Sequence, residues 1–541
     1  MPGPSVWKSL RAFQIFGANT NVGKTIVSTA LLKALIARNE IASYIKPVST
    51  GDLSEADTCH LTKYVSGVET TCLFQFDEPV SPHLAAAGFA NVPDDTKIVE
   101  LLRDFLASKS KASLNTAGMT QKSWALVETA GGVLSPGPSG TVQADIYRPL
   151  RLPVVLVGDS NLGGISSTIS SFESLHLRGF DVVALVTFEN QIYQNHLYFK
   201  DYFQGRIPSI TTLTAPPQYP ESEDKSLDQL AMTSYYERSS SENPIINMID
   251  DLDDWHSQRI DNLESLSARA EKTIWYPFSQ HNSINKRTIA TIDSAYNDFF
   301  QVLKSPDDEN ILKDSNDSLV VSSFDGSGSW WTQGLGHGNP KLALSAANAA
   351  GRYGHVILAN TINQPAMELA ETLLKNIKNP RMNRVFYSDN GSTAIEVAIK
   401  MALKATANRY SWDVSTDSLS IIGLKRSYHG DTIGSMDCSE PSLYNRQINW
   451  YANKGCWFDY PSVSYSEGEW TVGVPDSLKS ILGGDKKFKD LNSVFDLERR
   501  DASVYSNYIY QTIQNWTSTG VKFGAVLFEP VILGAGGMVL V

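Results

Sequence analysis

The sequence predicts an α/β protein with at least two domains. Its 541 residues exceed what one hydrophobic core accommodates, so two to four domains are expected. Over residues 12–215, valine-rich apolar segments alternate with segments of helical periodicity. Valine-rich strands without polar alternation are typical of a parallel sheet that helices cover on both faces. The first domain is therefore predicted to be a parallel sheet between two layers of helices.

One helix and five strands carry this prediction. The helix is expected over residues 26–39, where Ala, Leu and Ile recur at helical spacing. The strands are expected over residues 12–17, 42–48, 124–128, 152–159 and 181–188. Each strand is followed by a helical or polar segment, which is the order that parallel connections require.

The segment from Glu221 to Trp255 differs in composition from its surroundings. It holds ten acidic residues against two basic ones, which is typical of a solvated connection between domains. After it, the pattern of a globular domain returns and continues to Val541. The predicted organisation is a first domain over residues 1–220, an acidic linker over 221–262 and a second domain over 263–541.

The overall composition argues against several classes of protein. Hydrophobic residues make up 42% of the chain and charged residues 19%, which is typical of a globular protein. The net charge of -12 argues against a nucleic-acid-binding protein that uses a broad basic face. No apolar segment is long enough to span a membrane, so neither nucleic acid nor membrane is expected as a partner.

Cysteine spacing and the first residues bear on the compartment. The four cysteines form no close-spaced pair, which argues against a disulfide framework or a zinc ribbon and suits a reducing environment. The first residues, "MPGPSVWKSLR", contain no apolar secretory core, although Lys8 and Arg11 leave an organelle signal open. An intracellular protein is expected, in the cytoplasm or in an organelle.

The segment "GANTNVGKT", from Gly17 to Thr25, has the composition of a phosphate-binding loop. Gly17 and Gly23 allow a tight turn whose N–H groups point at an anion, and the following helix directs its positive end there. Lys24 can reach the β- and γ-phosphates of a nucleotide, and the Thr25 hydroxyl can bind Mg²⁺. The loop is one residue longer than the common pattern, so a glycine-rich turn with a solvated lysine is the alternative.

Two acidic residues are candidates for the remaining ligands of Mg²⁺. Glu128 ends the apolar strand of "WALVETAGG" and precedes a loop of small residues. Asp57 lies in "SEADTCHL". Carboxylates at strand ends on the sheet that carries a phosphate loop are suited to this role, although either acid can also be an ordinary surface charge.

Five motifs of the first domain occur in the order seen in dethiobiotin synthetase, which the sequence therefore resembles. They are "GANTNVGKT", "KPVSTG" from Lys46, "EAD" ending at Asp57, "SPHLAA" from Ser81, and "VETAGG". The loop of that family carries the same extra residue, although it commonly has Thr-Asp where this chain has Ala18-Asn19. The resemblance implies ATP- and Mg²⁺-dependent ring closure of 7,8-diaminononanoate with CO₂, in a homodimer.

The same resemblance implies specific roles for residues of the first domain. Lys24 and Lys46 would be catalytic, flanking the carbamate and the γ-phosphate, with Thr50 on the substrate. Thr25, Asp57 and Glu128 would bind Mg²⁺. For the adenine side, Asn190 is the first candidate and Glu189 the alternative. The implied ATP-binding residues are Gly17, Thr20, Asn21, Val22, Gly23, Lys24, Thr25, Glu128, Gly131, Asn190 and Pro216.

A second set of motifs lies in the later part of the chain. "YSDNGSTAIEVAIKMAL" predicts a strand end, a polar loop and a helix, so that Gly391, Ser392 and Thr393 lie at a helix N-terminus suited to a phosphate. An ordinary helix cap is the alternative. "RSYHGDT" carries an aromatic face at Tyr428, and "VLFEPV" predicts a strand that ends at Glu529.

This second set resembles the class III pyridoxal-phosphate aminotransferases, a fold-type I family, and within them 7,8-diaminononanoate synthase. That enzyme moves an amino group from S-adenosylmethionine to 7-keto-8-aminononanoate, and its product is the substrate implied for the first domain. The two resemblances are those of a fusion of consecutive enzymes of biotin synthesis. Pyridoxal phosphate would contact Gly391, Ser392, Tyr428 and Glu529, and the substrate pocket would be lined by Tyr276, Trp330 and Trp331.

The aminotransferase resemblance leaves one role unassigned. In the family, the lysine that binds the cofactor covalently and the Asp paired with the pyridinium nitrogen follow the segment that matches "GAGGM", and no lysine of this chain has a matching context. The aminotransferase region is thus expected to be incomplete or to serve in dimerisation without catalysis. A phosphate-loop ATPase switch is a further alternative, against which the "KPVSTG" and "SPHLAA" motifs argue.

Overall fold

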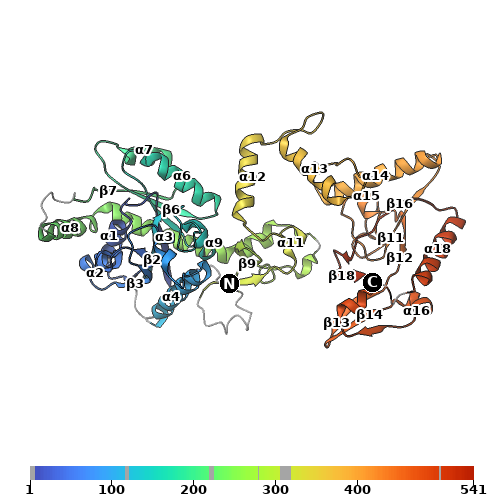
Figure 1. Cartoon of the computed structure of the whole chain (residues 1–541), viewed down its shortest axis with the longest axis horizontal. Helices are drawn as coiled ribbons and strands as arrows, with labels where there is room; N and C mark the ends of the chain where they lie inside the picture. Colours follow the sequence, from blue (N-terminus) through green and yellow to red (C-terminus); the bar gives the residue numbers. More distant parts are fainter. Residues whose placement is uncertain are drawn as a thin grey trace. The chain divides into compact units, whose positions relative to one another are not determined.

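The computed structural model describes residues 6–115, 121–217, 225–277, 279–304, 318–496, 498 and 501–540. The chain forms two compact units, Met1–Val356 and Ile357–Val541. Figure 1 labels their elements and colours the chain by position in the sequence. Each unit combines helices with strands, which confirms the predicted α/β class.

The first unit is built on a seven-stranded sheet with the order β3-β2-β4-β1-β5-β6-β7. Every pair of neighbouring strands in this sheet is parallel. All strands therefore end at the same edge, where ligands of open α/β sheets bind. The strands are β1 (Leu10–Gly17), β2 (Ile41–Thr50), β3 (Glu69–Phe76), β4 (Ser123–Gly132), β5 (Val154–Val157), β6 (Val182–Phe188) and β7 (Ser209–Leu213).

Two hydrophobic clusters lie on opposite faces of this sheet. In β1, Phe13 and Ile15 belong to one cluster, while Ala12 and Phe16 belong to the other, as the alternation of side chains along a strand requires. The first face is covered by α1 (Lys24–Ala37), α2 (Asp57–Tyr64), α8 (Lys225–Ser239) and α9 (Asn243–Thr273). The second face is covered by α4 (Asp95–Asn115), α6 (Gly164–Leu177) and α7 (Asn195–Tyr202). The predicted two-sided cover is confirmed.

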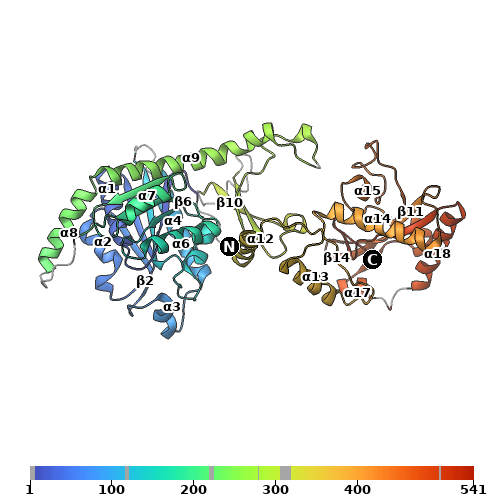
Figure 2. The same cartoon turned by 90° about the horizontal axis from the view of Figure 1, so that it is seen from above.

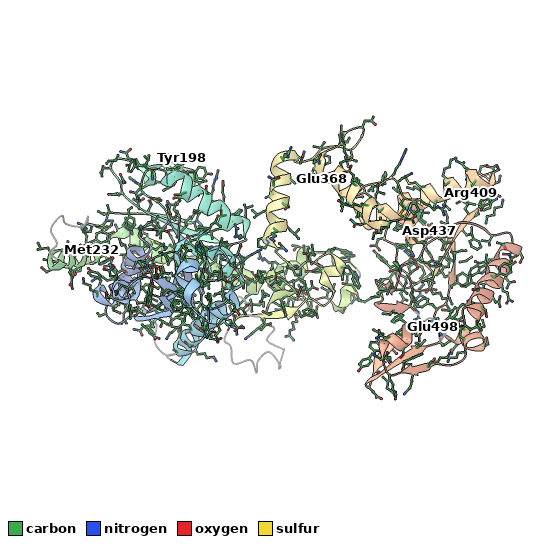
Figure 3. All side chains as sticks on the ribbon, in the orientation of Figure 1. Tyr198, Met232, Glu368, Arg409, Asp437 and Glu498 are labelled. Atoms are coloured by element: carbon green, nitrogen blue, oxygen red, sulfur yellow. The ribbon has the colours of Figure 1, made fainter. Side chains whose placement is uncertain are left out.

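The expectation of a solvated linker over residues 221–262 is wrong for its described part, from residue 225 on. Helices α8 and α9 occupy this part, and Figure 2 shows α9 running along the sheet of the first unit. Met232 of α8, labelled in Figure 3, is buried in the same cluster as Ile245, Met248 and Leu252 of α9. The apolar residues recur at helical spacing between the acids, which is the pattern of an amphipathic helix. The number of acidic residues alone does not reveal this pattern.

The acids of α9 also have partners in the first unit. Asp253 accepts hydrogen bonds from Arg11 Nε at 2.7 Å and from Lys122 Nζ at 2.6 Å. Helix α9 continues past residue 262, so the predicted boundary between linker and second domain falls inside a helix. The boundaries of the two domains remain predictions.

Three further expectations about strands need correction. Strands β3 and β7 were not expected, because their polar residues and half-buried edge positions hide the strand pattern. Residues 384–388 form no strand before the polar loop. Strand β16 (Lys522–Val526) ends before Glu529, and Val526 is exposed.

The first unit continues into a small antiparallel sheet. Strands β8 (Ile292–Tyr296), β9 (Phe299–Leu303) and β10 (Val320–Phe324) have the order β10-β9-β8, and they are followed by α11 (Gly328–Trp331) and α12 (Pro340–Tyr353). The backbone N–H of Leu319 donates to the carbonyl of Val6 at 2.7 Å. Residues assigned to the second domain thus pack against the start of the chain.

The second unit contains two sheets. The parallel one has the order β12-β11-β16, and the antiparallel one has the order β15-β14-β13-β18-β17. Their remaining strands are β11 (Leu419–Leu424), β12 (Gly455–Phe458), β13 (Ser462–Ser466), β14 (Glu469–Gly473), β15 (Lys486–Phe488), β17 (Ile532–Leu533) and β18 (Met538–Leu540). Its helices are α13 (Gln364–Ile377), α14 (Gly391–Tyr410), α15 (Ile433–Met436), α16 (Asp476–Leu482), α17 (Leu491–Phe495) and α18 (Ala502–Ser518).

One property concerns helices of both units. Among the described residues, none of the helices combines the length and the apolar character that a membrane crossing requires. The long helix α9, for example, carries charged residues along its exposed face.

Candidate functional site

The phosphate-type loop connects β1 to α1 at the carboxyl edge of the parallel sheet. Gly23 has φ of 92°, and Asn21 has φ of 59°, so two residues of the loop adopt the left-handed region. A side chain at Gly23 would lie 2.5 Å from the ring of Phe188, so this position requires glycine. Gly23 is the N-cap of α1, which places Lys24 and Thr25 in the first turn of the helix. The predicted loop context is confirmed.

Three oxygen-bearing side chains converge beside this loop. The Thr25 hydroxyl donates to Asp57 Oδ1 at 2.7 Å and lies 3.0 Å from Glu128 Oε1. Asp57 is the first residue of α2, and Glu128 lies in the buried strand β4. The structure therefore brings together the predicted metal ligands, which come from three separate segments of the chain.

Lys46 joins the two carboxylates from strand β2. Its ammonium lies 2.7 Å from Asp57 Oδ2 and 2.9 Å from Glu128 Oε1. Burial by itself would lower the pKa of Lys46, but the two carboxylates outweigh it and raise the pKa above the usual range. In the same way, burial opposes ionisation of Asp57, while Lys46 holds its pKa below the usual value. Asp57 and Lys46 are thus both charged at neutral pH.

Lys24 experiences a different environment. It is buried, and burial together with the nearby ammonium of Lys46 lowers its pKa to about 8. Two cations and two carboxylates therefore share one buried site beside an anion-binding loop. A polyanion that enters the site would be neutralised by Lys24 and Lys46.

The donor set fits a magnesium ion bound together with nucleotide phosphates. Mg²⁺ prefers hard oxygen ligands and keeps several waters, so it is usually held by one or two carboxylates plus phosphate oxygens. The hydroxyl of Thr25 and the carboxylates of Asp57 and Glu128 match this requirement. Among the described residues, no group of three or more His, Cys, Asp and Glu side chains could hold a metal ion, and this site contributes two carboxylates and a hydroxyl.

The other ATP-site candidates lie along the same edge of the sheet. Thr50 ends β2 and is half-buried. Gly131 lies at the end of β4, and a side chain there would come within 3.8 Å of the Thr20 hydroxyl, so the two loops adjoin. Asn190 and Pro216 follow β6 and β7.

For the candidate base-binding asparagine, the structure adds a local detail. The side-chain oxygen of Asn190 accepts hydrogen bonds from the backbone N–H groups of Ile192 and Tyr193 at 3.0 and 3.1 Å. This turn fixes the orientation of the amide side chain. The alternative, Glu189, is exposed, and its N–H donates to Leu213 in β7.

In the second unit, the polar loop precedes helix α14. The Asn390 side chain caps the helix by accepting from the Thr393 N–H at 3.0 Å, so the predicted helix and its N-terminal position are confirmed. The Ser392 hydroxyl accepts a hydrogen bond from the Asp431 N–H at 3.0 Å. A side chain at Gly430 would lie 2.6 Å from that hydroxyl, so glycine permits the contact.

Tyr428 and Glu529 meet at the same loop. The backbone N–H of Tyr428 donates to Glu529 Oε1 at 2.8 Å, and the Gly534 N–H donates to Oε2 at 2.7 Å. The Tyr428 hydroxyl donates to Asp431 at 2.6 Å, which fixes the ring at the surface. The structure thus brings together the candidates Ser392, Tyr428 and Glu529 through direct contacts and through Asp431.

The three candidates for the aminotransferase substrate pocket lie in the first unit. Trp330 and Trp331 belong to α11 and are exposed, whereas Tyr276 follows α9 and is half-buried. Both tryptophans have positive φ, at 55° and 71°. Such backbone is costly for bulky residues and often marks a functional segment.

Comparison with known proteins matches two families to different parts of the chain. Residues 11–217 match the family described as AAA domain, and residues 294–541 match the family described as Aminotransferase class-III. A protein of Emericella nidulans named bifunctional dethiobiotin synthetase/adenosylmethionine-8-amino-7-oxononanoate aminotransferase is 50% identical over 546 residues, covering 99% of this chain and 68% of that protein. The chain belongs to this bifunctional family.

The chain is also similar to two plant proteins. Both are named bifunctional dethiobiotin synthetase/7,8-diamino-pelargonic acid aminotransferase, mitochondrial. The protein of Arabidopsis thaliana is 32% identical over 98% of this chain and 69% of its own length. The protein of Oryza sativa subsp. japonica is 33% identical over 98% of this chain and 70% of its own length. Both resemblances drawn from the motifs, and the predicted order of a parallel-sheet domain followed by a class III aminotransferase region, are confirmed.

Sequence reasoning missed several residues that support the synthetase site of this bifunctional protein. The Ser28 hydroxyl donates to Glu128 Oε2 at 2.7 Å, and the carbonyl of Thr129 lies 3.3 Å from the Lys46 ammonium. Ser28 lies one helical turn after Thr25, so its spacing was a signal that could have identified it. The Ser171 hydroxyl of α6 donates to the Ala18 carbonyl at 3.2 Å and anchors the loop, and nothing local in the sequence indicates this contact.

A further support comes from helix α8. His60, one turn after Asp57 in α2, is hydrogen bonded through Nε2 to the Tyr236 hydroxyl at 2.7 Å. The rings of Tyr64 and Tyr236 lie 5.1 Å apart. Helix α2 has few buried residues of its own, so this aromatic cluster holds the helix that carries Asp57.

Proposed function

We propose that the first unit joins CO₂ to 7,8-diaminononanoate and closes the cyclic urea of dethiobiotin with ATP. The observation that carries this proposal is the cluster of buried Lys24, Lys46 and Glu128 with half-buried Asp57 beside the phosphate-type loop. It supplies two cations for a transferring phosphoryl group and two carboxylates for a metal ion. The names of the relatives support the same reaction.

The chemistry needs positioning and charge neutralisation more than covalent help from the protein. One amine of the substrate adds to CO₂ and loses a proton to give a carbamate. A carbamate oxygen then attacks the γ-phosphorus of ATP, and ADP leaves. The second amine attacks the mixed anhydride and expels phosphate, which closes the ring. Lys24 and Lys46 would stabilise the charge on the transferring group, and Thr20 and Thr50 would donate hydrogen bonds.

Mg²⁺ would be held by Thr25, Asp57 and Glu128. When bound, the ion neutralises phosphate charge and orients the phosphates for transfer. The Lys46 ammonium lies between these two carboxylates, 2.7 Å from Asp57 Oδ2 and 2.9 Å from Glu128 Oε1. From this position, Lys46 would also interact with the carbamate of the substrate.

The test is direct. The purified chain is supplied with 7,8-diaminononanoate, bicarbonate, ATP and Mg²⁺, and incorporation of labelled carbon into dethiobiotin is followed with release of phosphate. Equal amounts of both products are expected. Phosphate release without dethiobiotin would contradict the synthetase and favour a nucleotide switch.

For the later part of the chain, we propose a pyridoxal-phosphate site of an aminotransferase for S-adenosylmethionine and 7-keto-8-aminononanoate. Gly391 and Ser392 at the start of α14 would hold the cofactor phosphate, because a helix N-terminus favours an anion. The exposed ring of Tyr428 offers a stacking face. Glu529 would orient the loop, because its carboxylate accepts hydrogen bonds from the backbone N–H groups of Tyr428 and Gly534.

Pyridoxal phosphate, when bound, supplies the electron sink for amino transfer. No lysine among these 541 residues has the context of the covalent cofactor lysine, so we propose that none of them performs that role. Incubation of the chain with pyridoxal phosphate and borohydride, followed by peptide mapping, should then label no single lysine stoichiometrically. Amino transfer from S-adenosylmethionine should be absent as well. One lysine labelled to completion would refute this part of the proposal.

The assembly and the compartment are further parts of the proposal. A homodimer is the expected state, and light scattering of the purified chain would measure it. A mitochondrial location is supported by the names of both plant relatives. Fractionation of cells that carry the tagged natural protein would distinguish mitochondria from cytoplasm.

A further inference from the structure

A pocket of the first unit lies far from the phosphate-type loop along the sheet. It is formed by the segment before β5, the turn before β6 and the hairpin of β8 and β9, so it adjoins the amino edge of the parallel strands. The phosphate-type loop lies at the carboxyl edge. The pocket has a volume of about 270 Å³, and its main charged and polar lining residues are Arg148, Arg151, Arg178, Asp293, Tyr296 and Gln301.

The pocket is rich in hydrogen-bond donors. Arg148 Nη1 is buried and has no hydrogen-bond partner among the described residues, and the same is true of Arg151 Nε. The Arg148 guanidinium lies 5.7 Å from the centre of the Tyr296 ring. Gly338 leaves room for it, because a side chain there would come within 2.6 Å of Nη2. The guanidinium is thus held in place while part of its donor capacity is unused.

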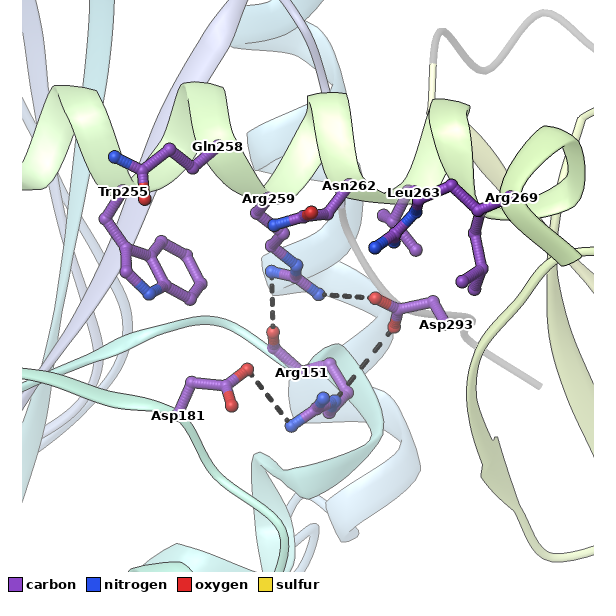
Figure 4. Close-up of a pocket in the computed structure, with 10 residues that line it drawn as sticks. Arg151, Asp181, Trp255, Gln258, Arg259, Asn262, Leu263, Arg269 and Asp293 are labelled. Atoms are coloured by element: carbon purple, nitrogen blue, oxygen red, sulfur yellow. Dashed lines mark hydrogen bonds and ion pairs between the residues drawn. The ribbon is translucent and has the colours of Figure 1, made fainter. Parts of the chain in front are cut away.

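The acid in the pocket does not cancel this capacity. Figure 4 shows Asp293 between Arg259 and Arg151, at distances of 3.0 and 4.0 Å. The Ser294 hydroxyl also donates to Asp293 at 3.0 Å. The carboxylate of Asp293 is therefore already compensated, and no acidic side chain in the described part of the chain forms an ion pair with Arg148.

The side chains around Asp293 carry more positive than negative charge. A second pocket of about 290 Å³, drawn in Figure 4, shares Arg151 and Asp293 with the first. Five arginines line the two pockets, against two aspartates. A third acid, Asp145, is engaged with Arg178 at 2.8 Å. This concentration of positive charge stands out in a chain with a net charge of -12.

We propose that this pocket binds a small oxyanion, a phosphate or a carboxylate, through Arg148 and Arg151. A guanidinium matches the geometry of both groups with two parallel hydrogen bonds, and a buried donor without a partner gains most from such a ligand. A volume of about 270 Å³ holds such an ion with several waters, since one water occupies roughly 30 Å³ in the liquid.

The ligand would connect two segments of the chain. Arg148 and Arg151 belong to the segment matched by the AAA domain family, and Ser294, Tyr296 and Gln301 of the opposite wall belong to the aminotransferase match. An oxyanion would therefore stabilise the packing of the β8–β9 hairpin against the sheet. This inference does not depend on the reactions proposed above.

Calorimetric titration of the full chain with inorganic phosphate and, separately, with acetate tests the proposal at constant ionic strength. A Lys24→Ala background weakens phosphate binding at the loop. Within it, Arg148→Gln should raise the dissociation constant of the bound ion about tenfold or more, because a charged bidentate donor is lost. Arg206→Gln is the matched control, since Arg206 also stacks on a tyrosine, Tyr202, at 4.5 Å but is exposed outside both pockets.

Comparing phosphate with acetate shows which of the two chemical groups the pocket binds. Circular dichroism checks that each variant is folded. Retained binding in Arg206→Gln with loss in Arg148→Gln supports the site. Equal affinity in both variants, or no binding of either ion to the parent protein at about 10 mM, a concentration chosen to detect weak sites, overturns it. If Arg148→Gln does not fold, Arg148→Lys replaces it, and intermediate affinity is then the supporting result.

Discussion

Two helix N-termini in this protein follow loops that are predicted to bind a phosphate, and the surroundings of these loops differ. At the start of α1, Lys24 is 8% exposed and Glu128 is fully buried within a sheet that helices cover on both faces. At the start of α14, Gly391 is exposed and the ring of Tyr428 is 43% exposed beside a three-stranded sheet. Both loops contain glycine, Asn and Thr around the start of a helix. The difference between them therefore lies in what packs around each loop.

The comparison shows how burial changes the value of the same local geometry. In the first site, low solvent access strengthens the interaction of Lys46 with Asp57 and Glu128 and holds the charges in place before any ligand binds. In the second, the contacts of Ser392, Tyr428 and Glu529 order the loop, but water screens charges near an exposed helix end. We therefore expect substitutions in the first site to have the larger effects. The following experiments measure effects in the first unit, from the largest expected to the smallest.

Lys24→Ala is expected to have the largest effect. Loss of the buried cation next to the phosphate-type loop should reduce dethiobiotin formation about a thousandfold, or roughly 4 kcal/mol of transition-state stabilisation. Steady-state rates of labelled dethiobiotin formation measure it. Lys33→Ala, in the same helix but outside the site, should retain near-normal turnover. A Lys24→Ala variant with more than a tenth of the normal rate would remove Lys24 from the mechanism.

Lys46→Ala separates the two lysines. It should reduce turnover about as strongly as Lys24→Ala, because the charge that faces the carbamate is lost. With Mg²⁺ present to neutralise Asp57 and Glu128, the dissociation constant of ATP should change by no more than about threefold. Calorimetry with Mg–ATP measures this. Equal loss of ATP affinity in both variants would show that the lysines share one role.

The acid stability of the first unit should depend on His256 of α9. Burial, with help from Arg11 and Arg259, lowers the pKa of His256 to about 4. The unfolded chain takes up a proton at its ordinary pKa near 6.5. The native state does so only near 4, so stability falls as the pH decreases from about 6.5 to about 4.

Urea unfolding at pH 7 and pH 5 measures the effect of His256. His256→Gln should remove about 2 kcal/mol of the stability that the parent protein loses between these pH values. His176→Gln, at an exposed position of α6, is the control and should leave the pH dependence unchanged. An identical acid loss in both variants would assign the effect to other groups.

Glu128→Gln should affect the metal rather than the fold. The amide keeps the shape of the side chain and can still contact Ser28 and Thr25, but it loses the charge that attracts Mg²⁺. The Mg²⁺ concentration at half-maximal rate should rise about tenfold. An unchanged Mg²⁺ titration with a reduced rate would show that Glu128 acts through its hydrogen bonds.

Tyr236→Phe should give the smallest effect. Loss of the hydroxyl that contacts His60 loosens helix α2 and the position of Asp57, which should raise the Mg²⁺ requirement about threefold. Tyr235→Phe is the matched control, because the Tyr235 hydroxyl donates to the Thr214 carbonyl instead. If the two variants behave alike, α8 supports the fold in general and does not position the metal ligand.

Much of the first site could be predicted from the sequence because its signals are local. The order strand, glycine loop, helix placed Gly23, Lys24 and Thr25 correctly, and the apolar segments identified most strands of the parallel sheet. The capped start of α14 was predictable for the same reason. The edge strands β3 and β7 were missed, since half-buried strands lose the apolar pattern that identifies central ones.

What the sequence by itself determined is therefore the set of chemical groups and the elements that carry them. Only the tertiary structure decided that Lys46 lies between Asp57 and Glu128, that α8 and α9 pack into the core, and that Arg148 faces a pocket. These contacts join residues distant in the chain, and their energy depends on burial and on charges from other elements. Neither burial nor the charge of neighbouring elements is a property of a local segment. For this reason the sequence of helix α9 predicts a linker, whereas the structure buries one face of the helix.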